Sequence, residues 1–323
     1  MYSHAVLKRF VKDYSLPIQI VQEPYFMYFI NLYDKQYDII NKFNLLQEAI
    51  KQSGSEDNFL NEYYKIRDNI ITSIEKLDKY KEYNTIKMDN YNVPNNSYPS
   101  HDIFNMSNVN KYFLSIDLKK ANFQVLKLFY PELVFNSNTY QELIGKFTNL
   151  EYMKESKYLR QVIFGNMNPK RQIKLERFII QKILDFILEK GFFKENQIRM
   201  VSNDEIIFEL DSSEDYDLWK ADYIKLINSI KNDLNYEVDI EIYKLLNIEG
   251  STKYFVKKLV NKKGYELMCI PIVYFAQIFK KYNNIQLEDN DLLFYYENQI
   301  CKFMNPLNLK SEDNNDEYST DER

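Results

Sequence analysis

The feature that most constrains the fold is a succession of apolar segments between residues 111 and 245. The first, Lys111-Tyr-Phe-Leu-Ser-Ile-Asp117, is short and rich in aromatic and branched residues, so it predicts a buried strand. Helical and strand-like segments follow it in turn. They predict a helix at 121–130, helices at 139–163 and 172–190, a strand pair at 199–210, a helix at 216–234 and a strand at 236–245. This order predicts an α+β fold whose mixed or antiparallel sheet carries its helices on one face.

The segments on either side divide the chain further. Residues 1–100 are expected to be mainly helical, because apolar residues recur there at helical spacing. A central domain then spans 101–246. Residues 247–308 predict two strands around Lys262-Lys-Gly264 and a short helix. The final residues, 309–323, are rich in acids and predict a disordered tail.

Composition excludes several classes of protein. The net charge of −5 gives no overall basic signature for nucleic acid. Two cysteines and two histidines exclude a disulfide framework and a zinc site, so any metal would be a hard cation on oxygen ligands. The longest apolar stretch, Cys269–Phe279, is shorter than the roughly 20 residues that cross a bilayer. We therefore expect a soluble chain with no membrane partner, located in the cytoplasm, or in the host cytoplasm if the protein is viral.

Carboxylates stand at the ends of two predicted strands. Asp117 ends the first strand, immediately before a helix, where it could also serve as the helix N-cap. Asp204 and Glu205 stand between the two short strands of the predicted hairpin, where they could also form an exposed acidic turn. If these strands are neighbours, the acids lie at one edge of the sheet. Carboxylates without histidine in such a place predict a Mg²⁺ (or Mn²⁺) site of the two-metal kind.

A basic segment lies between these acids. From Lys154 to Lys194 the chain has ten basic and four acidic residues, a local charge of +6 in a protein that is acidic overall. Such a segment attracts phosphate, although it could also be a solvated helix face.

Taken together, these segments resemble the palm of nucleic-acid polymerases. The resemblance is closest to family-A DNA polymerases, in which a strand-borne Asp precedes a helix and a hairpin carries Val-His-Asp-Glu. Here Ser202-Asn-Asp-Glu-Ile-Ile-Phe-Glu209 aligns with that hairpin without a gap. Arg160 precedes Phe164-Gly165 at the spacing of the family's Lys and Phe-Gly pair. The compact order is equally similar to reverse transcriptases and viral RNA polymerases.

The resemblance covers roughly residues 105–245 and implies the roles of the acids. Asp117 and Asp204 would hold two Mg²⁺ ions, Glu205 would support them, and the backbone of Leu118 would contact the triphosphate. Residues 139–190 would form a short fingers-like insertion, and 247–308 a thumb-like or primer-grip-like region. The implied partners are a nucleic-acid template and primer and nucleoside triphosphates.

The resemblance also implies nucleotide contacts. Arg160, Lys170 and Arg171 are the candidates for binding phosphates, with Arg160 first because of its spacing. Phe164 would stack near the nascent base pair, or would be an ordinary core residue. Asn122, five residues after Asp117, would abut the sugar of the nucleotide, and its modest size implies weak discrimination between ribose and deoxyribose.

Two other regions have expected roles. Lysines interleave with aromatic residues after the central domain, a pattern that suits a nucleic-acid backbone or a protected edge strand. The residues are Lys253, Lys257, Lys258, Lys262 and Lys263 with Tyr254, Phe255 and Tyr265. The N-terminal helices could cover the template or offer a surface to a protein partner.

The sequence therefore favours a template-directed DNA polymerase without a proofreading exonuclease, of a viral or mobile-element kind used in DNA replication. Three alternatives stay open. The first is a nucleotide cyclase or a template-independent nucleotidyltransferase. The second is a catalytically inactive palm that binds nucleic acid or acts as a scaffold. The third is a helical interaction protein.

Overall fold

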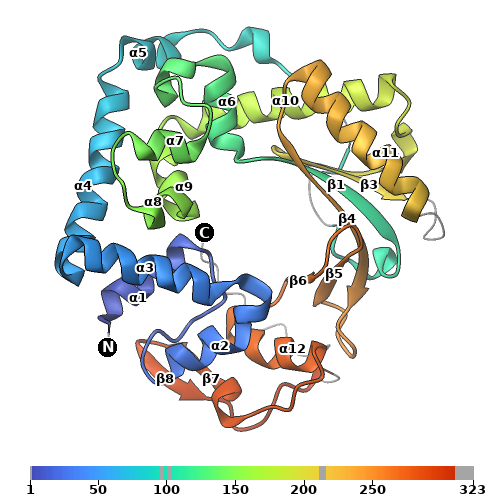
Figure 1. Cartoon of the computed structure of the whole chain (residues 1–323). Helices are drawn as coiled ribbons and strands as arrows, with labels where there is room; N and C mark the ends of the chain where they lie inside the picture. The colour runs from blue at the N-terminus through green and yellow to red at the C-terminus, as the bar shows by residue number, and fades with distance from the viewer. Residues whose placement is uncertain (1, 95–97, 100–102, 211–215, 310–323) are drawn as a thin grey trace.

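A computed structural model describes residues 2–94, 98–99, 103–210 and 216–309, without the side chains of 216–221 (Figure 1). The α-helices are α1 (His4–Asp13), α2 (Tyr25–Tyr37), α3 (Ile39–Ser53), α4 (Glu56–Glu75), α5 (Asp78–Thr85), α6 (Ala121–Phe129), α7 (Tyr140–Gly145), α8 (Glu151–Glu155), α9 (Lys157–Gly165), α10 (Pro169–Glu189), α11 (Tyr216–Ser229) and α12 (Phe275–Tyr282). The strands are β1 (Tyr112–Leu118), β2 (Ile198–Val201), β3 (Glu205–Leu210), β4 (Val238–Asn247), β5 (Phe255–Leu259), β6 (Tyr265–Met268), β7 (Leu293–Tyr296) and β8 (Gln299–Lys302).

A six-stranded antiparallel sheet with strand order β2-β3-β1-β4-β5-β6 forms the centre of the fold, and β7 and β8 form a separate hairpin. In the chain, β1 and β2 are separated by helices and flank β3, while β3 and β4 are separated by α11 and flank β1. This is the split β-α-β arrangement, in which each strand pair encloses a third strand. The predicted α+β fold with an antiparallel sheet is confirmed.

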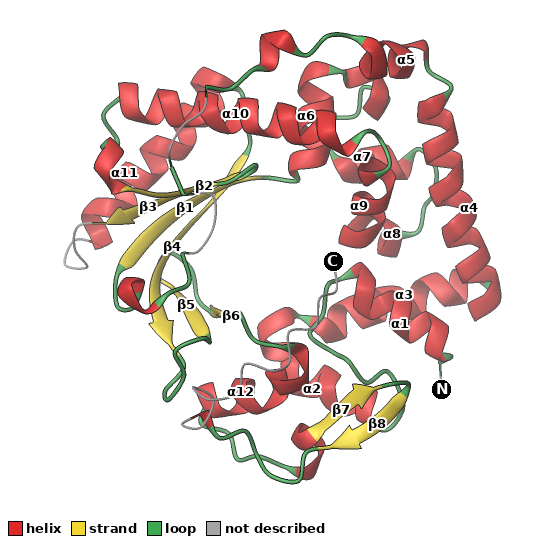
Figure 2. Ribbon diagram, turned by 180° about the vertical axis from the view of Figure 1, so that it is seen from behind, coloured by secondary structure: helices red, strands yellow, loops and turns green. Residues whose placement is uncertain are grey.

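The two faces of this sheet differ in polarity. Helices α6, α10 and α11 cover one face of the sheet (Figures 1 and 2). Leu114, Ile116 and Leu118 of β1 are buried in the main hydrophobic core. Phe113 points to the other face and joins a smaller apolar cluster with Tyr243. Further along that face stand Ser115 and Asp117, because alternate residues of a strand share a face. The open face is therefore apolar at one end of β1 and acidic at the other.

The predicted helical insertion is broken into shorter pieces. Residues 139–163 were expected to be helical, and they form α7, α8 and α9 rather than one rod. Thr139 caps α7 by accepting a hydrogen bond from the backbone N–H of Glu142 (3.0 Å), and Ser156 caps α9 by accepting one from Leu159 (2.9 Å). Thr139 thus starts α7, and Ser156 both ends α8 and starts α9.

The N-terminal helices share the main core with the rest of the chain. Phe10, Phe26, Phe43 and Phe59 are buried in the same cluster as the sheet and the insertion. Leu309 is also buried, against a small cluster near α12, and the rest of the expected acidic tail lies outside the described residues.

Candidate functional site

The predicted acids meet at one edge of the sheet. Asp117 is paired across β1–β3 with Glu205 and across β1–β4 with Asp239. Directly opposed residues of antiparallel strands share a face, so these three side chains lie side by side. The backbone N–H of Leu118 donates to the carbonyl of Asp204 at 2.8 Å, which fixes that residue at the end of β1. Three acids from three neighbouring strands therefore lie side by side, with Asp204 in the adjacent turn.

The hairpin that carries Asp204 is held by Ser202. The Ser202 backbone N–H donates to the Glu205 carbonyl (2.8 Å), and its hydroxyl accepts from the Glu205 backbone N–H (3.1 Å). The same hydroxyl lies 3.3 Å from the Asp204 carboxylate. Arg177 of α10 donates its Nε to the side-chain oxygen of Asn203 at 2.5 Å. The turn is thus fixed from the sheet and from the helix behind it.

Asp117 is not a helix cap. The residue that precedes α6 is Lys120, in a left-handed backbone conformation (φ 50°), and it makes no side-chain cap hydrogen bond. Asp117 lies three residues earlier and forms no ion pair with any described residue. Its carboxylate is therefore available to a ligand.

A pocket of about 500 Å³ opens beside these acids, between the sheet edge, α6, α9 and α10. Its charged lining is balanced between four acids and four bases. These are Asp117, Glu176, Asp204 and Asp239 with Lys119, Lys120, Lys157 and Arg160. An acidic wall facing a basic wall suits an anion that arrives with divalent cations, such as a triphosphate.

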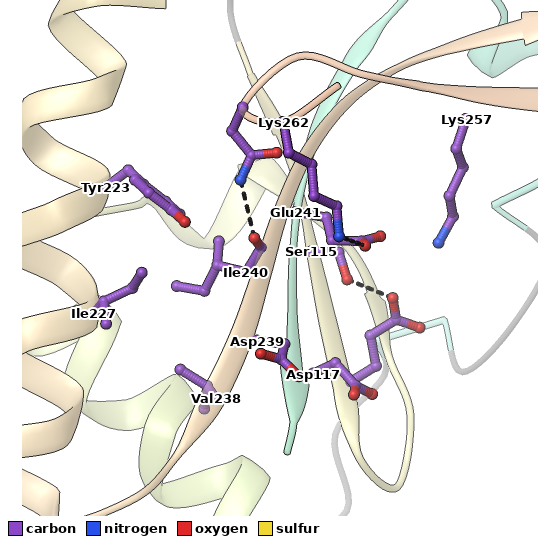
Figure 3. A pocket seen from close by; sticks show the side chains of 12 residues that line it. Ser115, Asp117, Tyr223, Ile227, Val238, Asp239, Ile240, Glu241, Lys257 and Lys262 are labelled. Carbon is purple, nitrogen blue, oxygen red and sulfur yellow. Dashed lines mark hydrogen bonds and ion pairs between the residues drawn. The ribbon is translucent and has the colours of Figure 1, made fainter. Parts of the chain in front are cut away.

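A second pocket of about 650 Å³ lies on the other side of Asp117 and Asp239 (Figure 3). Glu205 faces it and accepts a hydrogen bond from the Ser115 hydroxyl. Lys262 is paired with Glu241 at 2.6 Å in this pocket. Glu205 is therefore turned toward a different space from Asp204, although the two are adjacent in the chain.

Burial and crowding of like charges raise the pKa of two of these acids. Burial, followed by the charges of Asp204 and Glu205, raises the pKa of Asp117 to about 7. Burial, followed by the charge of Asp204, raises the pKa of Glu176 to about 7. Both carboxyls hold protons more strongly than usual at neutral pH, and a bound cation would release those protons.

The basic wall has an unsatisfied donor. Burial lowers the pKa of Arg160, and its guanidinium lies 5.8 Å from the ring centre of Tyr140. The Nε of Arg160 is buried and has no hydrogen-bond partner among the described residues. Burial, followed by the charge of Arg160, lowers the pKa of Lys120 as well. Two crowded, partly desolvated cations of this kind gain from an anion placed between them.

The structure places only some of the predicted nucleotide contacts in the pocket. Leu118, Asn122 and Arg160 line it. Lys170 and Arg171 do not, because they lie in the first turn of α10 on a different side of the helix from Glu176. Lys170 is exposed, and Arg171 donates to the backbone carbonyl of Ile86 at 2.7 Å.

The prediction that Phe164 stacks near the nascent base pair is not supported by its position. Its side chain is completely buried, with ring centres 6.0 Å from Phe123 and 6.4 Å from Tyr140. It packs α9 onto α6 and cannot reach a base in this conformation. The alternative that it is an ordinary core residue is the correct one.

Sequence reasoning missed Asp239 and Glu176. Asp239 had a usable signal, since Val238-Asp-Ile-Glu-Ile242 alternates apolar and acidic residues and so predicts an acidic face on one strand. Glu176 had no such signal, because one acid within a basic amphipathic helix does not show whether its side chain points toward the site.

Only oxygen donors line the acidic wall, which is the donor set that Mg²⁺ and Mn²⁺ prefer. Within the described residues, no three His, Cys, Asp or Glu side chains are grouped closely enough to hold a metal ion as they stand. The carboxylates fit a hard cation by chemistry, and they would need to turn toward it on binding.

No protein-family model matches the chain, and a search of curated proteins finds no match. Within the described part of the chain, no helix is both long and apolar enough to pass through a bilayer.

Proposed function

We propose that this chain is a template-directed nucleic-acid polymerase, a nucleotidyltransferase with a polymerase-like palm, and most simply a DNA polymerase without a proofreading exonuclease. The observation that carries the proposal is the meeting of Asp117 and Asp204 at one sheet edge, opposite the basic wall of α9. The split β-α-β order of the sheet and the position of Arg160 support the resemblance to polymerase palms.

Asp117 and Asp204 would hold Mg²⁺ or Mn²⁺, with Asp239 and Glu176 near enough to assist. When bound, such ions supply activation of the attacking hydroxyl and neutralisation of the phosphates. Side chains of the protein would bind the nucleotide. Arg160 and Lys120 would contact the oxygens of the triphosphate, where charge builds up on the leaving group.

The resemblance to palms places Asn122 by the sugar of the nucleotide, and Asn122 lines the same pocket as Arg160. The template and primer would lie along the open face of the sheet. Of the lysines expected to bind the backbone, Lys258 and Lys263 are exposed, whereas Lys257 is buried beside the ring of Tyr243.

The test is extension of a labelled primer on a template, with Mg²⁺ or Mn²⁺ and either ribo- or deoxyribonucleoside triphosphates. Asp204→Asn should reduce extension at least 100-fold, since it removes a charged ligand. Asp233→Asn is the matched control, because Asp233 is exposed and forms no ion pair with a described residue. Absence of extension with every nucleotide set and both metals would refute the proposal, and cyclic products from triphosphates alone would favour a cyclase.

A further inference from the structure

The position of Arg160 in the pocket depends on the backbone of α9. No carboxylate of the described residues forms an ion pair with the Arg160 guanidinium, which packs against Tyr140 at 5.8 Å from the ring centre. The backbone N–H of Arg160 donates to the carbonyl of Ser156 at 3.4 Å, so Arg160 lies in the first turn of the helix. A shift of that turn would therefore move Arg160 relative to the acids of the pocket.

Ser156 fixes the start of this turn. It is completely buried, and its hydroxyl oxygen accepts a hydrogen bond from the backbone N–H of Leu159 at 2.9 Å. The same hydroxyl donates to the Oδ1 atom of Asp13 at 2.9 Å. Because a hydroxyl has one proton and two lone pairs, donation to Asp13 turns a lone pair toward the helix N-terminus. Asp13 thus determines how Ser156 caps α9.

Asp13 is held by elements that do not belong to the pocket. It is the last residue of α1 and is completely buried. Its Oδ1 atom also accepts from Tyr63 of α4 (2.7 Å), and its Oδ2 atom accepts from Tyr152 of α8 (2.7 Å). Burial raises the pKa of Asp13 to about 6, so the carboxylate is largely ionised at pH 8 and can only accept. A buried acceptor with three donors is fixed in place, because moving it would leave polar groups unpaired.

The same helix contacts the first turn of α9 at a second point. The guanidinium of Arg9 lies 5.1 Å, and the Nζ atom of Lys12 4.7 Å, from the ring centre of Tyr158. Tyr158 is adjacent in the chain to Lys157, which lines the pocket. Arg9, Lys12 and Asp13 share a face of α1, because residues three and four apart are neighbours on a helix. That face therefore supports the turn that presents the basic wall.

We propose that Asp13 is a positioning residue for the triphosphate: by orienting the Ser156 hydroxyl it fixes the first turn of α9, and with it the place of Arg160 in the pocket. This inference rests on the proposed function, which supplies the triphosphate as the ligand. It gives the N-terminal region a part in nucleotide binding, although no described residue of 1–100 lines the pocket itself.

The experiment measures the binding of inorganic triphosphate with Mg²⁺ by calorimetry at pH 8, at a temperature at which circular dichroism shows every variant to be folded. Asp13→Ala removes the acceptor, and Ser156→Ala removes the cap. Each should weaken triphosphate binding by about fivefold or more, because charged contacts depend on geometry. Asp13→Asn is the conservative variant. Its Oδ1 atom can still accept from Ser156, so it should weaken binding by less than about twofold.

Tyr63→Phe is the matched control. It removes a hydrogen bond of similar length to the same oxygen of Asp13, but it leaves the bond from Ser156 and keeps a ring beside Arg9. It should lower stability and leave triphosphate binding within about twofold. If Tyr63→Phe weakens binding as much as Asp13→Ala does, the loss comes from general loosening and the positioning role is wrong.

The effect must also pass through Arg160. In an Arg160→Ala background, Asp13→Ala and Ser156→Ala should cause little further loss of triphosphate binding, because residues that act through one contact are not additive. Fully additive losses in that background would overturn the positioning role. Unchanged binding in both single variants, or no binding of triphosphate by the unaltered protein, would overturn it as well.

Primer extension by the same variants separates this role from the proposed function. We expect the KM for nucleotide to rise in Asp13→Ala while the Kd for primer and template stays the same. Triphosphate binding in the predicted pattern, without extension by the unaltered protein, would refute the polymerase and leave the positioning role intact. Extension with an unchanged KM for nucleotide in Asp13→Ala would refute the positioning role and leave the polymerase intact.

Discussion

Replacing Asp117 with Asn is expected to stabilise the protein in the absence of metal. The pKa of Asp117 is raised from 3.8 to about 7 by burial and by the neighbouring carboxylates. The folded state therefore binds this proton more tightly than the unfolded state does. The stabilisation from this proton is fully present below pH 3.8 and is lost as the pH rises through about 7. At pH 8 the folded protein holds an unfavourable charge that Asn does not carry.

The difference between the two pKa values corresponds to about 4 kcal/mol in the free energy of unfolding. Because Asp117 still borders a pocket open to solvent, we expect roughly half of this, about 2 kcal/mol. For a chain of this size, that change raises the melting temperature by about 2–4 °C at pH 8. At pH 5 the gain should be much smaller, because Asp117 is then largely protonated.

The assay is thermal unfolding of the unaltered protein, Asp117→Asn and the control Asp233→Asn at pH 5 and pH 8, with a chelator and with Mg²⁺. Mg²⁺ should stabilise the unaltered protein at pH 8 and should have much less effect on Asp117→Asn. An equal gain at both pH values would contradict the electrostatic reasoning. Equal Mg²⁺ stabilisation of both proteins would contradict the assignment of Asp117 as a ligand.

Three further predictions concern other parts of the protein. Asn122→Tyr should lower the ratio of ribonucleotide to deoxyribonucleotide incorporation, measured by competition, and an unchanged ratio would exclude Asn122 as the sugar contact. Arg160→Ala should lower kcat/KM about 100-fold in primer extension, because it removes a charged phosphate contact. The control Arg171→Ala changes a residue outside the pocket and should change kcat/KM by less than about threefold. Equal losses in the two variants would mean that the pocket is misassigned. Asp13→Asn should lower the free energy of unfolding by about 1–3 kcal/mol in urea titrations at pH 5, because buried Asp13 accepts hydrogen bonds from Tyr63, Tyr152 and Ser156. The loss should be smaller at pH 8, because burial raises the pKa of Asp13 to about 6 and the folded protein then holds a costly buried charge; no loss at pH 5 would show that these hydrogen bonds contribute little.

The sequence of the N-terminal region predicts helices with one apolar side and leaves open what covers that side. In the structure Phe10, Phe26 and Phe43 pack on one another, and Phe59 packs on Tyr152 of α8. The periodicity shows that one side of each helix must be covered, and it does not show what covers it.

The sequence alone determined the order of the strands and helices between residues 111 and 245 and the ends of the strands beside Asp117 and Asp204, but it did not reveal the β7–β8 hairpin. Those features depend on local chemistry: branched and aromatic residues favour strands, helical spacing favours helices, and Ser202-Asn-Asp makes a tight turn. The acidic strand ends are therefore evident in the sequence itself.

Only the tertiary structure decided which other residues lie beside Asp117 and Asp204. The register of β1 with β4 brings Asp239 beside Asp117, and the rotation of α10 turns Glu176 into the pocket and Lys170 away from it. The packing of α9 on α6 buries Phe164, which the motif had placed near a base. Strand register and helix rotation are set by contacts between segments distant in the chain, and the pattern within one segment does not contain that information.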